Sequence, residues 1–194
     1  MPGKLLNGYE TLLVVPAVEI NGVPWMVTPT GLVDYEAPTA AALNVFQAIN
    51  QPSDAYASQG GNISCAVLDD MNLGLASSDT SDTKTLCSKG NTEALTFFNF
   101  NAEVSVLRDE DIDGDGVFNL ARDLFRAPDV AYFLVHRVRG GKDSTETFAA
   151  GDEVDIYYVW TDNPVPVFGD GEEQAISMSF IQKSIVNVGY ELTA

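Results

Sequence analysis

The chain has 194 residues, of which 45% are hydrophobic, so it can bury a core and its composition excludes a disordered protein. Acidic residues number 28 against 10 basic ones, and the resulting net charge of −18 argues against a protein that grips nucleic acid phosphates. Cys65 and Cys87 are the two cysteines, without a CxxC pair, so we expect no zinc site and two reduced thiols.

The N-terminal region is predicted to form a β-hairpin. Residues 11–20 give a strand whose two faces are both largely apolar, and the apolar run within it is too short to cross a bilayer. Asn21-Gly22 is the favoured pair for a two-residue turn, and residues 23–27 return as the partner strand. Because Pro24 and Pro29 remove backbone donors, we expect this partner either to lie at a sheet edge or to leave the sheet. Residues 1–30 are thus predicted to be an N-terminal hairpin and arm that a neighbouring subunit can use.

The next segments give weaker signals. Residues 40–49 suit a helix or a strand; the alanine-rich start, with Thr39 as N-cap, favours a short helix. Residues 51–61 are polar and glycine-rich, which predicts a flexible loop. We expect a modest strand over 62–68, a short strand or turn over 71–76, and a Ser/Asp/Thr loop over 77–83.

The centre of the chain is predicted to be a strand, an acidic loop, a helix and a second strand. Residues 96–107 alternate, so that apolar side chains share one face and polar ones share the other. A helix from Val117 to Arg126 shows helical spacing of apolar residues, with Asp115 as its expected N-cap and Pro128 ending it. Residues 131–139 then form a second strand.

The C-terminal third adds further strands. Residues 154–160 alternate clearly, residues 163–166 break the pattern with two prolines, and residues 174–182 and 185–192 read as two more strands. The expected fold is mainly β, a sandwich or barrel of mostly antiparallel strands with one flanking helix, and residues 1–194 are expected to form a single domain.

The acidic loop resembles the start of a calcium-binding loop. The candidate ligands are Asp111, Asp113, Asp115 and Asn119, which fall at the spacing of a D-x-D-x-D-G motif. Calcium loops are usually closed by a carboxylate at the twelfth position, where this chain has Arg122. The alternative is a solvated acidic loop beside the positive end of a helix.

Catalytic motifs are absent from the sequence. His136 is the sole histidine and lies within an apolar strand, which favours a structural role, and there is no G-x-S-x-G elbow, P-loop or G-x-G-x-x-G fingerprint. We therefore expect no enzyme and no cofactor. Arg137, Arg139 and Lys142 form a basic cluster that reads equally well as a solvated face and as an intersubunit contact to an acidic neighbour.

Several phrases of the sequence resemble the major tail tube proteins of long-tailed bacteriophages, especially those that infect actinobacteria. They are the Ser/Thr/Asp run ending in Leu86-Cys87, the aromatic strand that follows, and Leu-Arg-Asp-Glu-Asp before a short helix. Later phrases in the same order are a strand ending in arginines, Ala-Gly-Asp-Glu-Val-Asp at 150–155, and Thr-Asp-Asn-Pro at 161–164. The resemblance covers about the last two-thirds of the chain.

The resemblance implies a structural virion subunit that assembles as stacked hexameric rings into a hollow tail tube. Its partners would be other copies of itself, the tape-measure protein, the tail terminator and the distal tail proteins, with double-stranded DNA passing through at ejection and no membrane involved. Assembly would take place in the cytoplasm of the bacterial host. An acidic wall would let DNA slide past. The candidates for the channel wall are the polar residues of wet strand faces: Asn99, Asn101, Glu103, Glu153, Asp155, Ser177 and Ser179.

Two other functions compete with the tube subunit. A calcium-dependent β-sandwich that binds or adheres would use the acidic loop, and calcium-dependent thermal stability would favour it. A hydrolase is the weakest alternative, since the chain lacks a nucleophile with an evident base.

Overall fold

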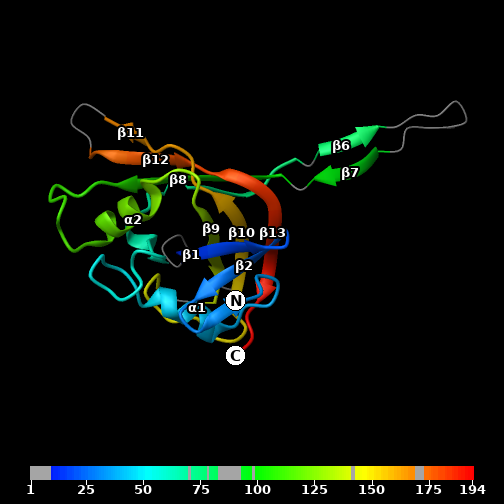
Figure 1. Cartoon of the computed structure of the whole chain (residues 1–194), viewed down its shortest axis with the longest axis horizontal. Coiled ribbons are helices and arrows are strands. Elements are labelled where there is room, and N and C mark those ends of the chain that lie inside the picture. Colours follow the sequence, from blue (N-terminus) through cyan, green and yellow to red (C-terminus); the bar gives the residue numbers. More distant parts are fainter. Residues whose placement is uncertain are drawn as a thin grey trace, which may run out of the picture.

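A computed structural model describes residues 10–69, 71–77, 79–82, 93–97, 99–140, 143–168 and 173–194. Within these residues the chain forms a β-sandwich of two antiparallel sheets, accompanied by two α-helices and a two-stranded ribbon (Figure 1). The predicted fold class, mainly β with a flanking helix, is confirmed, and of the sandwich and barrel alternatives the sandwich is the one that forms.

The larger sheet has seven strands. Its order is β13-β10-β9-β1-β2-β3, with the short β4 beside β1. The bounds are β1 (Thr11–Ile20), β2 (Val23–Thr28), β3 (Gly31–Val33), β4 (Gly61–Asn62), β9 (Ala131–Arg139), β10 (Glu153–Trp160) and β13 (Ile181–Glu191). The sheet therefore joins the first strand of the chain to strands from its last third.

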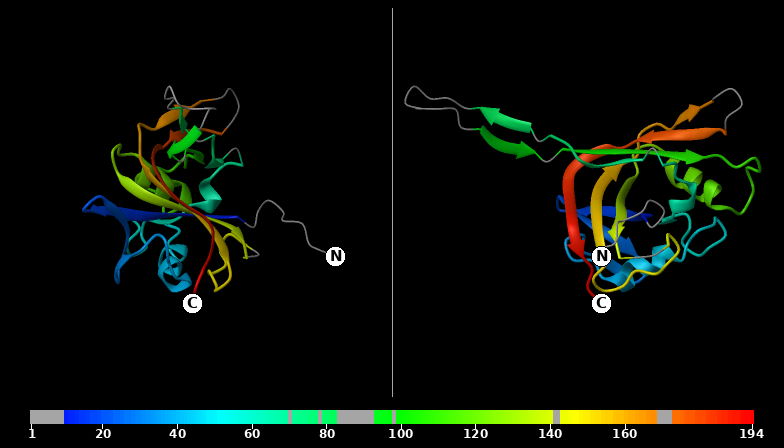
Figure 2. Two further views of the ribbon diagram at one scale, coloured as in Figure 1. Left: turned by 90° about the vertical axis from the view of Figure 1, so that its right-hand side faces the viewer. Right: turned by 180° about the vertical axis from the view of Figure 1, so that it is seen from behind.

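The smaller sheet has the order β11-β12-β8-β5. Its strands are β5 (Asn72–Leu75), β8 (Phe100–Leu107), β11 (Val165–Val167) and β12 (Ala175–Ser179). Two further strands, β6 (Asp79–Asp82) and β7 (Glu93–Phe97), pair with each other and project well away from the sandwich (Figures 1 and 2).

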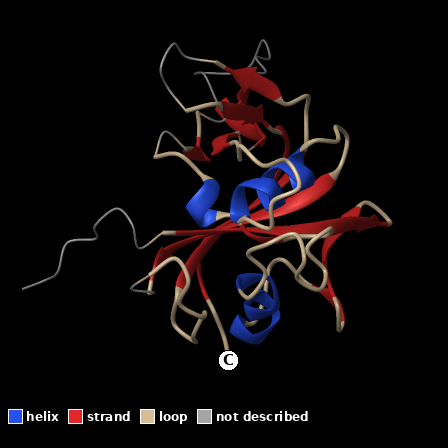
Figure 3. Ribbon diagram, turned by 90° about the vertical axis from the view of Figure 1, so that its left-hand side faces the viewer, coloured by secondary structure: helices blue, strands red, loops and turns tan. Residues whose placement is uncertain are grey.

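The helices lie on opposite faces of the larger sheet. Helix α1 (Ala40–Gln47) covers one face, while α2 (Val117–Phe125) and the short 3-10 helix η1 (Ser64–Ala66) lie on the face that also carries the smaller sheet (Figure 3). Leu120, Ala121 and Leu124 recur at helical spacing and are buried, so α2 forms because its apolar stripe faces the core. The centre of the larger sheet is thus covered on both sides.

Aromatic contacts bind the layers together. Phe100 of β8 packs against Tyr157 of β10 with ring centroids 5.2 Å apart, which joins the two sheets. Phe125 of α2 meets Phe180 edge-on at 5.2 Å. On the other side of the larger sheet, Phe133 stacks on Tyr35 at 5.5 Å. Such pairs add specific geometry to the burial of apolar area.

Short-range signals in the sequence predicted several elements correctly. Asn21 and Gly22 have φ values of 53° and 81°, so the turn between β1 and β2 has the left-handed backbone that an Asn-Gly pair accommodates. Thr39 caps α1 as predicted, its side-chain oxygen accepting from the Ala42 N–H at 3.2 Å. The strand over residues 131–139 is confirmed with its predicted bounds.

Other predictions were wrong. The expected strand over 62–68 is the end of β4 followed by η1, and the expected loop over 77–83 contains β6. The single strand expected over residues 96–107 is not formed, because β7 ends at Phe97 and β8 begins at Phe100. β2 is an inner strand because β3 pairs beyond it. The break predicted over residues 163–166 does follow the end of β10 at Trp160, but Val165 and Pro166 then belong to β11 at the edge of the smaller sheet.

Candidate functional site

The outer face of the smaller sheet gathers polar side chains from three strands. In β8 the even-numbered residues from Phe100 to Val106 are buried while Asn101 and Glu103 are exposed, which confirms the alternation predicted for this strand. Residues directly opposite in the register share a face, and Glu103 lies between Asn72 of β5 and Ser179 of β12. We call this surface the polar sheet face: Asn72, Asn101, Glu103, Ser105, Ser177 and Ser179.

The polar sheet face brings together four of the seven residues predicted to line a channel. These four are Asn101, Glu103, Ser177 and Ser179. Asn99 immediately precedes β8, where its side-chain amide donates to the Ser77 carbonyl at 3.1 Å. Sequence reasoning missed Asn72, because the four-residue strand β5 is too short to show an alternation.

Glu153 and Asp155 lie apart from this face, on β10 of the larger sheet. Glu153 pairs with Arg139 on the neighbouring strand. Asp155 accepts a hydrogen bond from the Gly189 N–H at 2.7 Å, and the Tyr157 hydroxyl lies 3.4 Å from its other oxygen. Burial, with Asp155 beside it, raises the pKa of Tyr157. Both carboxylates therefore serve contacts within the larger sheet.

Arg137 is fully buried, contrary to either reading of the sequence, which placed it on a solvated face or against a neighbouring subunit. Its guanidinium donates to the carbonyls of Glu146 at 2.9 Å and Asp143 at 2.8 Å and to the Thr11 hydroxyl at 2.8 Å. It also lies 3.5 Å from the Asp152 carboxylate. Glu146, Asp143 and Asp152 belong to the segment between β9 and β10, whereas Thr11 belongs to β1, so Arg137 joins that segment to the sheet.

The surroundings of Arg137 explain two further residues. The Phe148 ring lies under the guanidinium, with its centroid 4.6 Å from the Arg137 Cζ. Gly140 has a φ of +126°, and a Cβ there would overlap the Asp152 side chain, so only glycine leaves room for that carboxylate. Nothing in the sequence marked Asp152 as the partner of Arg137.

Arg139, two residues further along β9, has the opposite environment. Its side chain is exposed and pairs with Glu153. Lys142, the third member of the predicted basic cluster, lies outside the described residues, as do Cys87 and residues 1–9 of the predicted arm.

The acidic loop is closed by its own hydrogen bonds. The Asn119 side-chain nitrogen donates to the carbonyls of Asp111 and Gly114, both at 2.8 Å, which fills the loop with a donor where a cation needs oxygen. The Asp113 N–H donates to the Asp111 carboxylate at 3.1 Å, and Asp115 accepts from the Ser53 N–H at 2.9 Å. Among the described residues no group of three or more acidic, histidine or cysteine side chains is placed to hold a metal ion. Calcium binding by Asp111, Asp113, Asp115 and Asn119 therefore stays a prediction, and in this arrangement the Asn119 side chain offers the loop a donor rather than an oxygen ligand.

Asp115 is also not the N-cap of α2. Gly116 occupies the N-cap position and has no side chain to cap the helix, and the Asp115 carboxylate accepts from Ser53 instead. The expected N-cap thus links the acidic loop to the turn after α1.

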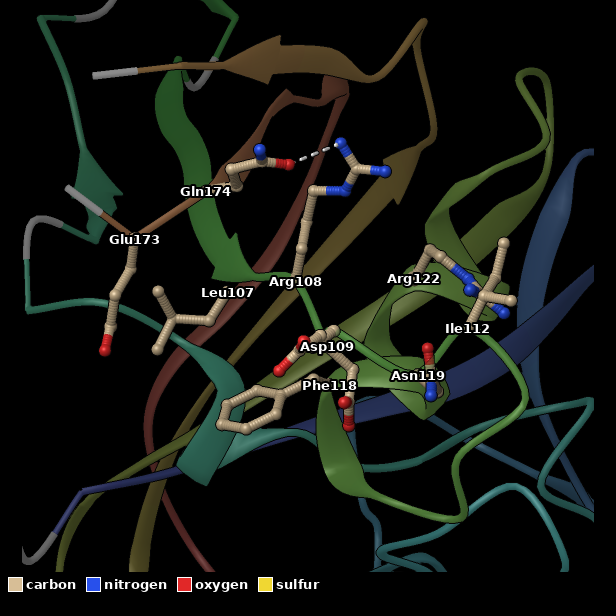
Figure 4. Close-up of a pocket in the computed structure, with 10 residues that line it drawn as sticks. Leu107, Arg108, Asp109, Ile112, Phe118, Asn119, Arg122, Glu173 and Gln174 are labelled. Atoms are coloured by element: carbon tan, nitrogen blue, oxygen red, sulfur yellow. Dashed lines mark hydrogen bonds between the residues drawn. The ribbon is translucent and has the colours of Figure 1, made fainter. Parts of the chain in front are cut away.

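A groove of about 720 Å³ runs between the acidic loop, α2 and the start of β12 (Figure 4). Arg108 extends across it and donates to the Gln174 side chain at 3.2 Å, and Arg122 pairs with Asp123 at 3.0 Å. Its ten lining residues are apolar, amide, carboxylate or arginine side chains, without a nucleophile and base in contact. The groove therefore has no catalytic arrangement.

A smaller hollow of about 250 Å³ lies beside His136. The ring is buried, and its Nε2 lies 3.4 Å from a Glu10 carboxylate oxygen. His136 belongs to β9, which pairs with β1 on one side and with β10 on the other. Its position inside the sheet agrees with the structural role predicted from the sequence.

In the described part of the chain, these features define a β-sandwich with a polar outer sheet face and two surface hollows. No helix found there has the length and apolar character needed to span a bilayer.

The chain belongs to the phage tail tube proteins, since the family model "Phage tail tube protein" matches residues 21–191. It is therefore a structural subunit of a virion tail, which assembles into a tube with other tail proteins. No curated protein matches the sequence. The resemblance seen in the sequence is confirmed at the level of this family.

Proposed function

We propose that six copies of this chain form a ring, and that stacked rings form the tail tube through which DNA leaves the virion. The polar sheet face carries the proposal, because it is a wet sheet surface without a lysine or arginine, and its one charged residue, Glu103, is acidic. A wall of amide, hydroxyl and carboxylate groups offers phosphates no cationic partners and hence few contacts that release counterions.

The openness of the smaller sheet supports a ring. In the described part of the chain, β5 and β11 each pair on one side only, so both edges of this sheet present unpaired backbone groups. A cyclic assembly uses two different surfaces of each copy, one on either side. Two open edges on one sheet meet that requirement, and pairing between the edges of neighbouring copies continues the sheet around a channel.

The remaining partners follow from the same proposal. The tape-measure protein fills the channel before DNA does, the tail terminator and distal tail proteins cap the two ends, and assembly takes place in the host cytoplasm. Asn99 extends the proposed channel wall beyond the polar sheet face. Arg139 is the arginine of the predicted basic cluster that is exposed for contact with an acidic neighbour, whereas Arg137 is not.

Electron microscopy of the purified protein tests the proposal. At high protein concentration and about 1 M NaCl, where the screening length falls to about 3 Å, we expect hexameric rings or hollow tubes. Monomers at every protein and salt concentration would contradict the self-assembling ring. Tubes that hold Asn101, Glu103 and Ser179 on the outer surface would contradict the channel assignment while leaving the tube itself intact.

A further inference from the structure

The sheet formed by β1, β2 and β3 has an apolar outer face that the described part of the chain leaves uncovered. In β2 the residues alternate strictly: Pro24, Met26 and Thr28 are buried, whereas Val23, Trp25 and Val27 point outward. An outward face in an ordinary half-wet sheet carries polar residues. Here both alternating sets are mostly apolar, so the sequence suits a strand that is covered on both faces.

The neighbouring strands continue this surface. Val18 pairs with Trp25, Ile20 pairs with Val23, and Val27 pairs with Leu32, so their side chains share one face. We call it the apolar hairpin face: Val18, Ile20, Val23, Trp25, Val27 and Leu32. Val18, Ile20, Val23 and Leu32 are 37%, 40%, 48% and 48% exposed, and none of the six packs against the core.

The composition of this face matches the centre of a protein interface. Trp25 is flanked along its strand by Val23 and Val27 and faced by Val18 across the register. Tryptophan surrounded by aliphatic side chains is the arrangement in which interface energy concentrates. The only charged residue at this end of β1, Glu19, points to the other face.

We infer that the apolar hairpin face docks on a second copy of this chain, an inference that rests on the proposed function. Copies that each carry a net charge of −18 repel one another over most of their surfaces. The apolar hairpin face brings no charge to the contact, and burying it supplies an attraction that does not depend on charge. In a tail tube, other copies of the chain are also the subunit's most numerous neighbours.

A triple variant, V18T/V23T/V27T, tests this inference. Threonine has the shape and strand preference of valine but replaces a methyl group with a hydroxyl, so the sheet is kept while the outer face becomes polar. We expect the triple variant to raise the protein concentration at which rings or tubes form by about ten-fold or more. Its thermal unfolding midpoint as a monomer should match that of the wild type.

The matched control is Ile112→Thr, which removes an equally apolar side chain that is 65% exposed in the acidic loop. This variant should assemble like the wild type. If the triple variant also assembles like the wild type, the inference is overturned and the proposed function stands. A wild-type chain that never assembles would instead overturn the proposed function, and the inference with it.

A photo-crosslinker placed at residue 23 gives a second readout that does not depend on the triple variant. Within assembled wild-type material it should join two copies of the chain. Crosslinks from residue 23 only to a different tail protein, in tails isolated from infected cells, would overturn the choice of a second copy as the occupant.

Discussion

The described residues cover the larger sheet on both faces at its centre but on one face only at its β1–β3 end. At the centre, Tyr157 faces the smaller sheet and Phe133 faces Tyr35, so both alternating sets of side chains are buried. At the far end, Met26 is buried while its neighbour Val27 points outward. The sequence is apolar on both faces in both regions. The comparison suggests a rule for reading strands. A strand that is apolar on both faces is expected to be buried on both faces in the assembled protein, and the residues that bury it can belong to another chain.

The substitution of Arg137 is expected to cause the largest loss of stability, because this residue lies in the part of the larger sheet that is buried on both faces. Replacing it with alanine removes five hydrogen bonds and leaves the Asp152 carboxylate without its buried partner. We expect Arg137→Ala to lower the free energy of unfolding by about 3–5 kcal/mol, measured by chemical denaturation. Arg139→Ala is the matched control, because its exposed ion pair should contribute about 1 kcal/mol or less. Equal losses in the two variants would contradict the buried role of Arg137.

Met26 and Val27 allow the two faces of the sheet to be compared at its β1–β3 end, where one face is buried and the other is exposed. Met26 is 1% exposed within the core, so Met26→Ala should lower the free energy of unfolding by about 2–5 kcal/mol. Val27→Thr, one residue along the same strand, should change it by about 0.5 kcal/mol or less while weakening assembly. A Val27→Thr variant as unstable as Met26→Ala would show that the monomer itself covers the apolar hairpin face.

The salt dependence of assembly distinguishes an apolar contact between subunits from one made by ion pairs. Raising NaCl from about 0.1 to about 1 M shortens the screening length from about 10 to about 3 Å. Repulsion between acidic copies then falls while burial of the apolar hairpin face is unaffected, so rings should form at lower protein concentration. Light scattering during a salt titration measures this. Assembly that weakens as salt rises would point instead to ion pairs such as those available to Arg139.

Tyr157 tests how completely the centre is covered. Burial, followed by the nearby Asp155 charge, raises the pKa of Tyr157 above the ordinary tyrosine value of 10.0. The folded state therefore holds this proton more tightly than the unfolded state, and the associated stability is complete below pH 10 and is lost as the pH rises above it. Tyr157→Phe should show a shallower loss of stability above pH 10, followed by circular dichroism. An unchanged alkaline profile would argue against a buried hydroxyl.

Calcium gives the smallest expected effect. Because the Asn119 side chain occupies the acidic loop with a hydrogen-bond donor, millimolar CaCl2 should leave the thermal unfolding midpoint unchanged compared with EDTA. A rise in that midpoint, abolished by Asp111→Asn, would revive the calcium-dependent binding module as a function.

The sequence predicted elements whose signals are local. The Asn21-Gly22 turn, the Thr39 cap and the alternation of β8 each depend on a few adjacent residues, and each is confirmed. Strand β6 was missed because its sequence, Asp-Thr-Ser-Asp, is typical of loops, and it forms only by pairing with β7.

Long-range contacts explain the remaining misses. Arg137 resembles a surface arginine in the sequence because its partners are mostly backbone carbonyls of the following loop, which no residue type marks. Likewise, β8 and β12 each showed a polar face, but only their register placed Glu103 beside Ser179. Four of the six residues of the polar sheet face were candidates from the sequence, whereas Asn72, Ser105 and the grouping itself were not predicted.

The pairing of β1 with β9 also has a consequence for folding during synthesis on the ribosome. Thr11 lies opposite Arg137, so the two strands at the middle of the larger sheet are separated by 126 residues of chain. A ribosome adding about 5–20 residues per second makes that stretch in about 6–25 s. Until β9 is made, the β1–β2 hairpin has no β9 to pack beside, so its apolar surface is exposed to association with other chains before the sheet closes.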